Sequence, residues 1–309
     1  MSQLLFTGLS AFPPLTPYRS GELDEHSFTS LLGALERSAV DSIAVLGSTG
    51  SYMYLTDYQR DAVAHHAASA VVDKPLVVGV SDVSTAKVLR HIKVAEEVSA
   101  TGVLVAPVSY QSLRADEVFY HFQAICESTE LPVIVYDNPG LTHFAFDVDL
   151  YRRIASLPGV ASLKIPATVV SGEHAVGIIS RIRSAIPEEV SIGISGDGGG
   201  ALGLAAGCDV WYSAVAGTFP IVGEKIIEPW LAGDNEGMLG VSAQYQRLWN
   251  LFERCGSSLR GIAALAAELG LVERECLPPP LLPLPMRYHS EIKKMAEELV
   301  LTEEKQQYC

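Results

Sequence analysis

The 309-residue sequence is poor in basic residues. It has 22 lysines and arginines against 36 aspartates and glutamates, which gives a formal net charge of −14. Binding to nucleic acid or to an anionic membrane requires a basic face, so this balance argues against both kinds of partner. A small-molecule partner is the more natural expectation.

The sequence also lacks paired cysteines and long apolar runs. Its cysteines form no CxxC pair, and their odd number and wide spacing favour reduced thiols in a cytoplasm over a disulfide framework or a metal site; they are Cys126, Cys208, Cys255, Cys276 and Cys309. No uninterrupted apolar stretch approaches the roughly 20 residues that span a bilayer, and the first residues lack a basic segment followed by an apolar one. We therefore expect a soluble, cytoplasmic protein.

Short apolar runs alternate with amphipathic segments along the first three quarters of the chain. The apolar runs are residues 5–12, 42–47, 75–80, 102–107, 131–136, 159–164, 190–195 and 208–213, and the segments of helical period are 57–72, 84–100, 115–129, 147–157 and 171–186. Near-continuous apolar strands separated by amphipathic helices indicate a parallel sheet covered by helices. Eight such units predict a closed (β/α)₈ TIM barrel over residues 1–232. An open doubly wound sheet is the alternative, but the first strand is not followed by the glycine-rich turn such a sheet usually carries.

Beyond residue 233 the strand signals stop. Helical patterns occupy residues 235–255, 259–271 and 291–300, and a proline-rich stretch, "LPPPLLPLP", covers 277–285. We expect residues 233–309 to form a C-terminal helical region packed on the barrel, with the prolines ending helices and stiffening the connection.

Lys164 stands out because it lies in an apolar run, "GVASLKIP". Burying an unpaired ammonium is costly, so the side chain either reaches water or a carboxylate, or serves as an amine with a lowered pKa that can form a Schiff base. In a barrel the active site lies at the carboxyl ends of the strands. There the sequence places Lys164 together with "GSTGS" at 47–51, "YDNPG" at 136–140, "SGDGGG" at 195–200 and "YSAVAG" at 212–217.

The order and spacing of these motifs, together with "FPPLTP" at 12–17, resemble the pyruvate-dependent class I aldolases and lyases that include dihydrodipicolinate synthase and N-acetylneuraminate lyase. The resemblance implies that Lys164 forms the Schiff base with an α-keto acid, so that no other cofactor is needed, and that Tyr136 shuttles protons. It also implies that Ser48 and Thr49 hold the keto-acid carboxylate. We place Gly50, Gly196, Asp197 and Tyr212 in the same substrate-binding set.

The chain departs from this family at several of the motif positions. Ser51 stands where a glutamate is usual, and Ile165 and Pro166 follow the lysine where an acidic residue is frequent. The family often has "PYYN" after the fourth strand, and its second tyrosine reaches into a neighbouring subunit; here "PVSYQ" puts Ser109 in register and Tyr110 one place later. We assign the catalytic set as Lys164, Tyr136, Ser48 and Tyr110, with Ser109 or Tyr110 left open as the replacement of that tyrosine.

The position of Leu141 bears on the second substrate. Dihydrodipicolinate synthases resemble "YNVPSRT" after the catalytic tyrosine, and the arginine holds the carboxylate of aspartate semialdehyde. This chain has "YDNPGLTHF", with Leu141 at that position, and leucine cannot make a bidentate contact with a carboxylate. Trp211, Tyr212 and Phe219 either line a bulky second-substrate region or pack in the core, and His143 could reach the mouth of the site.

The sequence therefore predicts a Schiff-base lyase or aldolase that joins or cleaves pyruvate, or a related α-keto acid, and an aldehyde, and whose range could include sugar-acid aldol cleavage or dehydration. Two alternatives stay open: a barrel that binds an α-keto acid without turnover, and a phosphosugar enzyme that uses residues 196–200 as a phosphate cradle. By the same resemblance we expect a homotetramer. The aldehyde, the direction and the pathway do not follow from the sequence.

Overall fold

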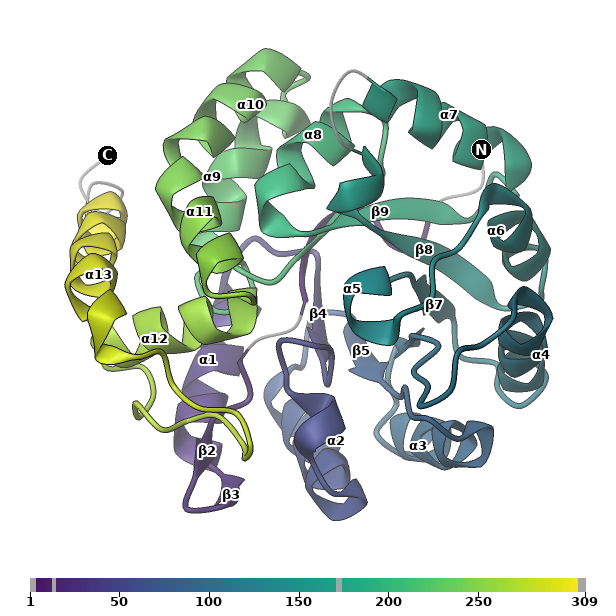
Figure 1. The fold of residues 1–309 in the computed structure, drawn as a ribbon, viewed down its shortest axis with the longest axis horizontal. Coiled ribbons are helices and arrows are strands. Elements are labelled where there is room, and N and C mark those ends of the chain that lie inside the picture. Colours follow the sequence, from purple (N-terminus) through teal and green to yellow (C-terminus); the bar gives the residue numbers. More distant parts are fainter. Residues whose placement is uncertain (1–3, 13–14, 171–173, 305–309) are drawn as a thin grey trace.

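The computed structural model describes residues 4–12, 15–170 and 174–304. Pro13 and Pro14 of the motif at 12–17, and the first three residues of the segment 171–186, lie outside the described residues. Within them, eight parallel strands close into a barrel in the order β1-β10-β9-β8-β7-β6-β5-β4. The (β/α)₈ prediction is confirmed (Figure 1).

The barrel strands are short and buried because each is packed on both faces. They are β1 (Gly8–Ala11), β4 (Ser42–Val45), β5 (Leu76–Gly79), β6 (Gly102–Val105), β7 (Val133–Tyr136), β8 (Val160–Pro166), β9 (Ser191–Ser195) and β10 (Val210–Ser213). Each coincides with one of the predicted apolar runs. A small hairpin of β2 (Tyr18–Arg19) and β3 (Glu22–Leu23) lies outside the barrel.

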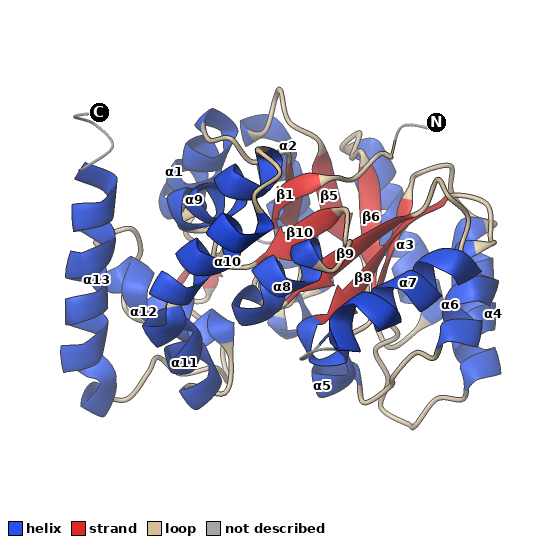
Figure 2. Cartoon of the chain, turned by 90° about the horizontal axis from the view of Figure 1, so that it is seen from above, coloured by secondary structure: helices blue, strands red, loops and turns tan. Residues whose placement is uncertain are grey.

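Helices cover the outside of the barrel, and Figure 2 shows the strands in the middle with helices around them. The helices of the barrel region are α1 (Glu25–Arg37), α2 (Asp57–Ala70), α3 (Thr85–Glu97), α4 (Ala115–Cys126), α5 (Pro139–Thr142), α6 (Val148–Ala155), α7 (Ala175–Ala185), α8 (Gly200–Ala205) and α9 (Pro220–Leu231). No helix in the described ranges is long and apolar enough to cross a membrane.

The C-terminal region consists of α10 (Asn235–Gln244), α11 (Gln246–Arg254), α12 (Ser258–Glu268) and α13 (His289–Glu304). The single helix expected over 235–255 is interrupted at Tyr245, which separates α10 from α11. The predicted boundary at residue 232 falls between α9 and α10, beside Gly233 with φ 81°. α10 packs against α8 and α9, while α13 stands at one end of the molecule (Figure 2).

The barrel has two apolar cores. Residues such as Leu9, Trp211 and Ile165 fill the layer between strands and helices. A second cluster, which includes Phe6, Phe12, Leu104, Ile134, Tyr136 and Tyr212, fills the barrel interior. Alternation along β10 separates the two, because Trp211 belongs to the outer layer and Tyr212 to the interior.

Candidate active site

Lys164 lies in β8 with 4% of its surface exposed. Its Nζ lies 3.9 Å from the ring centroid of Phe12 and 4.2 Å from that of Tyr136. Among the described residues, no carboxylate oxygen comes within 4.0 Å of this nitrogen. Burial lowers the pKa of Lys164 well below its usual 10.5, and the negative charge of Asp197 raises it only in part. Lys164 therefore does not snorkel to water and is not neutralised by an ion pair.

Tyr136 faces Lys164 from the neighbouring strand, because the two are paired in the β7–β8 ladder. Asn138 donates from Nδ2 to the phenol oxygen of Tyr136 at 2.7 Å. Burial raises the pKa of Tyr136 above its usual 10, and the hydroxyl of Ser48 lies close enough to lower it again in part. Lys164, Tyr136 and Ser48, three of the four predicted catalytic residues, are thus brought together.

The turn after β4 carries Ser48, Thr49 and Gly50. It is closed by a hydrogen bond from the amide of Ser51 to the carbonyl of Ser48 at 3.1 Å. A Cβ on Gly50 would lie 3.2 Å from the amide nitrogen of Leu46 and 3.3 Å from the carbonyl oxygen of Gly47, so the turn has little room for a side chain there. Within the described part of the chain, the amides of Thr49 and Gly50 donate to no acceptor.

Asp197 is buried just beyond β9, and its carboxylate points toward the end of β10. It accepts hydrogen bonds from the Ser213 hydroxyl at 2.9 Å and from the amides of Ala214 and Val215 at 3.1 Å each. Burial raises the pKa of Asp197 to about 6 in spite of these donors. Asp197 therefore fixes the β10 loop beside Lys164, and its role as a substrate contact stays a prediction.

The glycines of "SGDGGG" are explained by close packing. Gly196 has φ 103°, and a Cβ on Gly199 would lie 2.5 Å from the Cβ of Ala167. A Cβ on Gly200 would meet the Trp211 ring at 2.4 Å. These contacts, with a carboxylate in the middle of the segment, favour packing over a phosphate cradle.

Tyr212 lies inside the barrel, with its ring centroid 5.6 Å from Lys164 Nζ. Its hydroxyl donates to Ser162 Oγ at 2.7 Å. The side chain is fully buried, so it forms part of the wall around the lysine. Trp211 and Phe219 are also buried in the layer beneath the helices, which agrees with core packing for both.

Tyr110, the fourth predicted catalytic residue, is not brought to this group. It lies in the loop after β6, is 93% exposed, and makes no hydrogen bond or ring contact with the described residues. Ser109 beside it is half-buried. Leu141, in α5, is 63% exposed, and His143, with φ 57°, is exposed just beyond it. Any role of Tyr110 in a neighbouring subunit stays a prediction.

The chain resembles known proteins over most of its length. A model of the dihydrodipicolinate synthetase family matches residues 5–299. The chain belongs to this family. The crystal structure of dihydrodipicolinate synthase from Agrobacterium tumefaciens is 35% identical with a TM-score of 0.89, over 95% of this chain and 98% of that one. The enzyme of the same name from Thermotoga maritima is 25% identical with a TM-score of 0.86, over 96% and 99%.

Sequence identity to curated relatives lies in a similar range. The 4-hydroxy-tetrahydrodipicolinate synthase of Rickettsia typhi is 25% identical over 265 residues, which are 84% of this chain and 87% of that one. The dihydrodipicolinate synthetase family consists of lyases and aldolases of the pyruvate-dependent class I kind. At these identities the chain is a divergent member of the family.

Two residues of the site were not predicted from the sequence. Asn138 was part of a motif interpreted as a turn signal, and its hydrogen bond to the Tyr136 phenol appears only in the structure. Phe12 directly precedes two prolines at the end of β1, and an apolar residue at a strand end does not by itself indicate a contact with the lysine. Both belong to motifs used in the sequence analysis, but the direction of their side chains does not follow from spacing.

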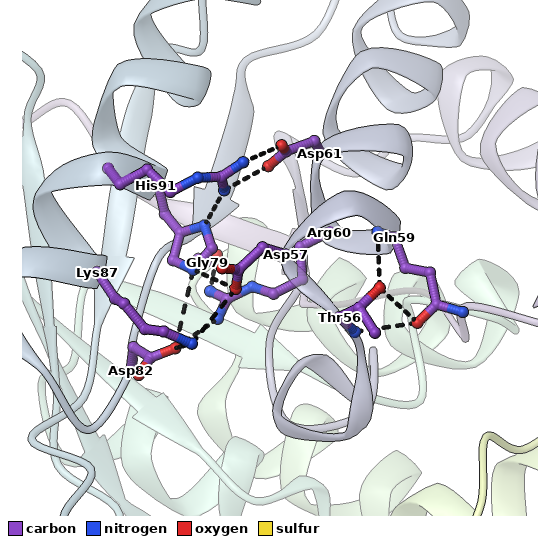
Figure 3. Close-up of polar contacts among 10 residues, drawn as sticks. Thr56, Asp57, Gln59, Arg60, Asp61, Gly79, Asp82, Lys87 and His91 are labelled. Atoms are coloured by element: carbon purple, nitrogen blue, oxygen red, sulfur yellow. Dashed lines mark hydrogen bonds and ion pairs between the residues drawn. The ribbon is translucent and has the colours of Figure 1, made fainter.

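A separate polar cluster lies between α2 and α3 (Figure 3). Asp57, Asp82 and His91 have ligand atoms within 4.8 Å of one another, as in a metal site. Lys87 Nζ lies 3.6 Å from Asp57 and 3.9 Å from Asp82, and Arg60 Nη1 lies 3.5 Å from Asp82. The two carboxylates are therefore already balanced by two cations of the chain.

The tautomer of His91 also argues against a metal site in this cluster. Arg90 can only donate, so its contact with His91 Nδ1 at 3.1 Å places the proton of the neutral ring on Nε2, the nitrogen that faces the carboxylates. Burial, with Arg60 and Arg90 nearby, lowers the pKa of His91 to about 4, so the ring is neutral at pH 7. This cluster is best explained as a charge-balanced link between the two helices.

Proposed function

We propose that this protein is a Schiff-base lyase or aldolase that acts on pyruvate or a related α-keto acid, with an aldehyde as the second substrate or product. The observation that carries the proposal is the burial of Lys164 without an ion pair, directly opposite Tyr136. Burial lowers the pKa of Lys164 and so favours its neutral amine, the form that attacks a carbonyl.

The turn at residues 48–50 supplies the place for the keto-acid carboxylate. Free amides of Thr49 and Gly50 can donate to a carboxylate, and the Ser48 hydroxyl can add a third bond. No positively charged side chain is needed for this contact. The keto carbon would then lie between the turn and Lys164.

The steps follow from these positions. The nitrogen of Lys164 forms a bond to the keto carbon, the carbinolamine loses water, and a protonated imine remains. When the bond between the next carbon and the aldehyde-derived carbon breaks, its electron pair forms a C=C bond to the imine carbon, and the C=N pair moves to nitrogen to give a neutral enamine. Formation of the bond is the reverse. The Tyr136 phenol, held by Asn138, transfers protons to and from the carbinolamine hydroxyl and the aldehyde oxygen. No further cofactor enters these steps.

The proposal also covers the kind of aldehyde and the oligomeric state. With Leu141 at the position expected for an arginine, we infer an aldehyde or sugar acid that does not depend on a second carboxylate contact there. We also infer a homotetramer in the cytoplasm, in which loops from neighbouring subunits meet near the sites.

Reductive trapping tests the proposal directly. Incubation with pyruvate and borohydride, followed by peptide mass mapping, is expected to give a covalent adduct on the peptide that contains Lys164. Lys164→Ala and Lys164→Arg should abolish the adduct. The matched control is Lys93→Arg, a change at an exposed lysine of α3, which should leave trapping intact.

The outcome also separates the alternatives. Absence of an adduct with pyruvate and with several other α-keto acids would remove the lyase assignment. Trapping without exchange of the pyruvate methyl protons into D₂O would favour a binding barrel without turnover. Tight binding of inorganic phosphate that is lost on substitution at residues 196–200 would instead favour a phosphosugar enzyme.

A further inference from the structure

The nitrogen of Lys164 is surrounded by aromatic faces. Its distances to the ring centroids of Phe12, Tyr136 and Tyr212 are 3.9, 4.2 and 5.6 Å. These three rings come from the ends of β1, β7 and β10, and all are at least nine-tenths buried. We call Phe12, Tyr136 and Tyr212 the aromatic cage.

The cage is supported by the surrounding packing. Phe12 and Tyr212 contact each other with ring centroids 4.7 Å apart and an interplanar angle of 51°. Gly193, which pairs with Lys164 across β8 and β9, leaves room for the Tyr212 ring, because a Cβ there would lie 2.2 Å from it. The Tyr212 hydroxyl is fixed by Ser162. The rings are thus held in place without a substrate.

A cationic intermediate at this nitrogen has few other sources of stabilisation. Among the described residues, the only carboxylate that acts on Lys164 is Asp197, whose charge is engaged by the Ser213 hydroxyl and by the amides of Ala214 and Val215. Among the described residues, the rings that lie over the nitrogen are those of Phe12, Tyr136 and Tyr212. The negative face of an aromatic ring attracts a cation, most strongly where water is excluded.

We propose that the aromatic cage stabilises the positive charge of the protonated imine formed at Lys164, and that Phe12 is a catalytic residue through its contact with this nitrogen. The inference rests on the proposed function. When the amine adds to the keto carbon and water leaves, the positive charge stays on nitrogen between the rings. When the bond between the next carbon and the aldehyde-derived carbon breaks, its electron pair forms the C=C bond of an enamine, the C=N pair moves to nitrogen, and the positive charge disappears.

This arrangement reconciles two opposing demands on the lysine. Burial keeps the free amine neutral for attack, while the protonated imine must persist in the same dry site to accept electrons. A nearby carboxylate would stabilise the imine but would also keep the free amine protonated. The aromatic faces provide a weaker attraction than a full negative charge, so the amine stays neutral and the imine cation is still favoured.

Fluorinated phenylalanines at position 12 test the cage with little change in shape. Phe12 would be replaced by the mono-, di- and trifluorinated forms, and the protonated imine with pyruvate would be trapped by cyanoborohydride over a range of pH. The amount trapped at subsaturating pyruvate is expected to fall log-linearly with fluorine number, by about 3- to 30-fold over the series. The alkaline limb of trapping should move to lower pH, because the imine loses its proton more easily.

The control is the same fluorinated series at Phe28, a fully buried phenylalanine of α1, which should leave trapping unchanged. If the amount of trapped imine did not fall with fluorine number at Phe12, or fell equally at Phe28, the proposed role of the aromatic cage would be wrong. If the wild-type protein forms no adduct at Lys164, the proposed function itself fails. An adduct in the wild type with a flat fluorine series would overturn only the role of Phe12.

Discussion

At the residue scale, we expect the phenol of Tyr136 to move protons rather than to hold the substrate. It lies against Lys164, accepts from Asn138, and has a pKa raised by burial. Tyr136→Phe should therefore still permit trapping of pyruvate at Lys164, since the amine remains. Aldol or retro-aldol turnover should fall by about 10²- to 10⁴-fold, the usual range for one acid–base group. Turnover of a sugar-acid substrate panel by the variant at the wild-type rate would contradict this role.

Leu141 leads to a second prediction at this scale. Because a leucine stands where an arginine is expected to bind the carboxylate of aspartate semialdehyde, condensation of that aldehyde with pyruvate should be absent or very poor. Loss of a charge-assisted contact costs about 1.5–3 kcal/mol, or roughly ten- to a hundredfold in rate. A coupled assay measures it, and Leu141→Arg should increase any residual rate. Efficient turnover by the unchanged protein would show the prediction wrong.

The sequence predicts part of this site for a physical reason. Residues that end buried parallel strands must gather at one rim of the barrel, so Lys164, Tyr136 and the turn at Ser48 could be placed together from their order alone. Contacts that depend on side-chain direction could not. Asp197 turns toward the amides of the β10 loop, and Phe12 points inward onto the lysine, and neither direction follows from the spacing of residues.

At the element scale, Asp137 and Tyr151 join the end of β7 to α6 next to Tyr136. The Tyr151 hydroxyl donates to Asp137 Oδ2, while the amide of Asp137 donates to the carbonyl of Lys164 at 2.9 Å. Asp137 is 1% exposed. Burial raises its pKa to about 6, and the Tyr151 hydroxyl and the Phe146 amide offset this only in part.

Stability should therefore depend on pH through Asp137. The folded state binds the proton of this carboxyl more tightly than the unfolded chain, so its contribution to stability is present below the unfolded pKa of about 3.9 and is lost as pH rises through about 6. Asp137→Asn stays neutral and keeps an acceptor for Tyr151. Its free energy of unfolding relative to wild type should rise by about 1–2 kcal/mol between pH 5 and pH 8.

Urea unfolding at the two pH values measures this difference. Asp197, whose pKa is also about 6, is present in both proteins and cancels from the comparison. Asp73→Asn, a change at an exposed carboxylate, is the control and should show no such dependence. If the free energy of unfolding depended on pH equally in Asp137→Asn and wild type, Asp137 would not be the source of the pH dependence.

The elements themselves were predicted unevenly. Apolar runs located all eight barrel strands, because a strand buried on both faces has no polar alternation to obscure it. α8 was missed because its sequence, GALGLA, contains two glycines and directly follows two more, and glycine disfavours a helix. The short hairpin β2–β3 has too few residues to give a period. The break between α10 and α11 was not predicted because the residue at the break is Tyr245, and no glycine or proline stands there.

At the scale of the whole molecule, exposed apolar side chains gather on the loops and helix ends that follow three neighbouring strands. Tyr54 and Tyr58 follow β4, Val83 follows β5, and Tyr110 follows β6. These strands are adjacent in the barrel, so the segments share one sector of its rim. Tyr110 is the most exposed of the four and lies in the stretch that the family resemblance leads us to expect at a dimer contact.

We therefore expect a stable homotetramer built from dimers, with Tyr110 buried between two subunits. Light scattering after size exclusion should give the mass of a tetramer at micromolar concentration. Tyr110→Asp should shift the population toward smaller species, because it places a charge in an apolar contact, whereas Val176→Asp, at an exposed position of α7, should leave the mass unchanged. A monomeric wild-type protein at this concentration would refute the assembly, and a Tyr110→Asp tetramer as stable as the wild type would show that the contact lies elsewhere.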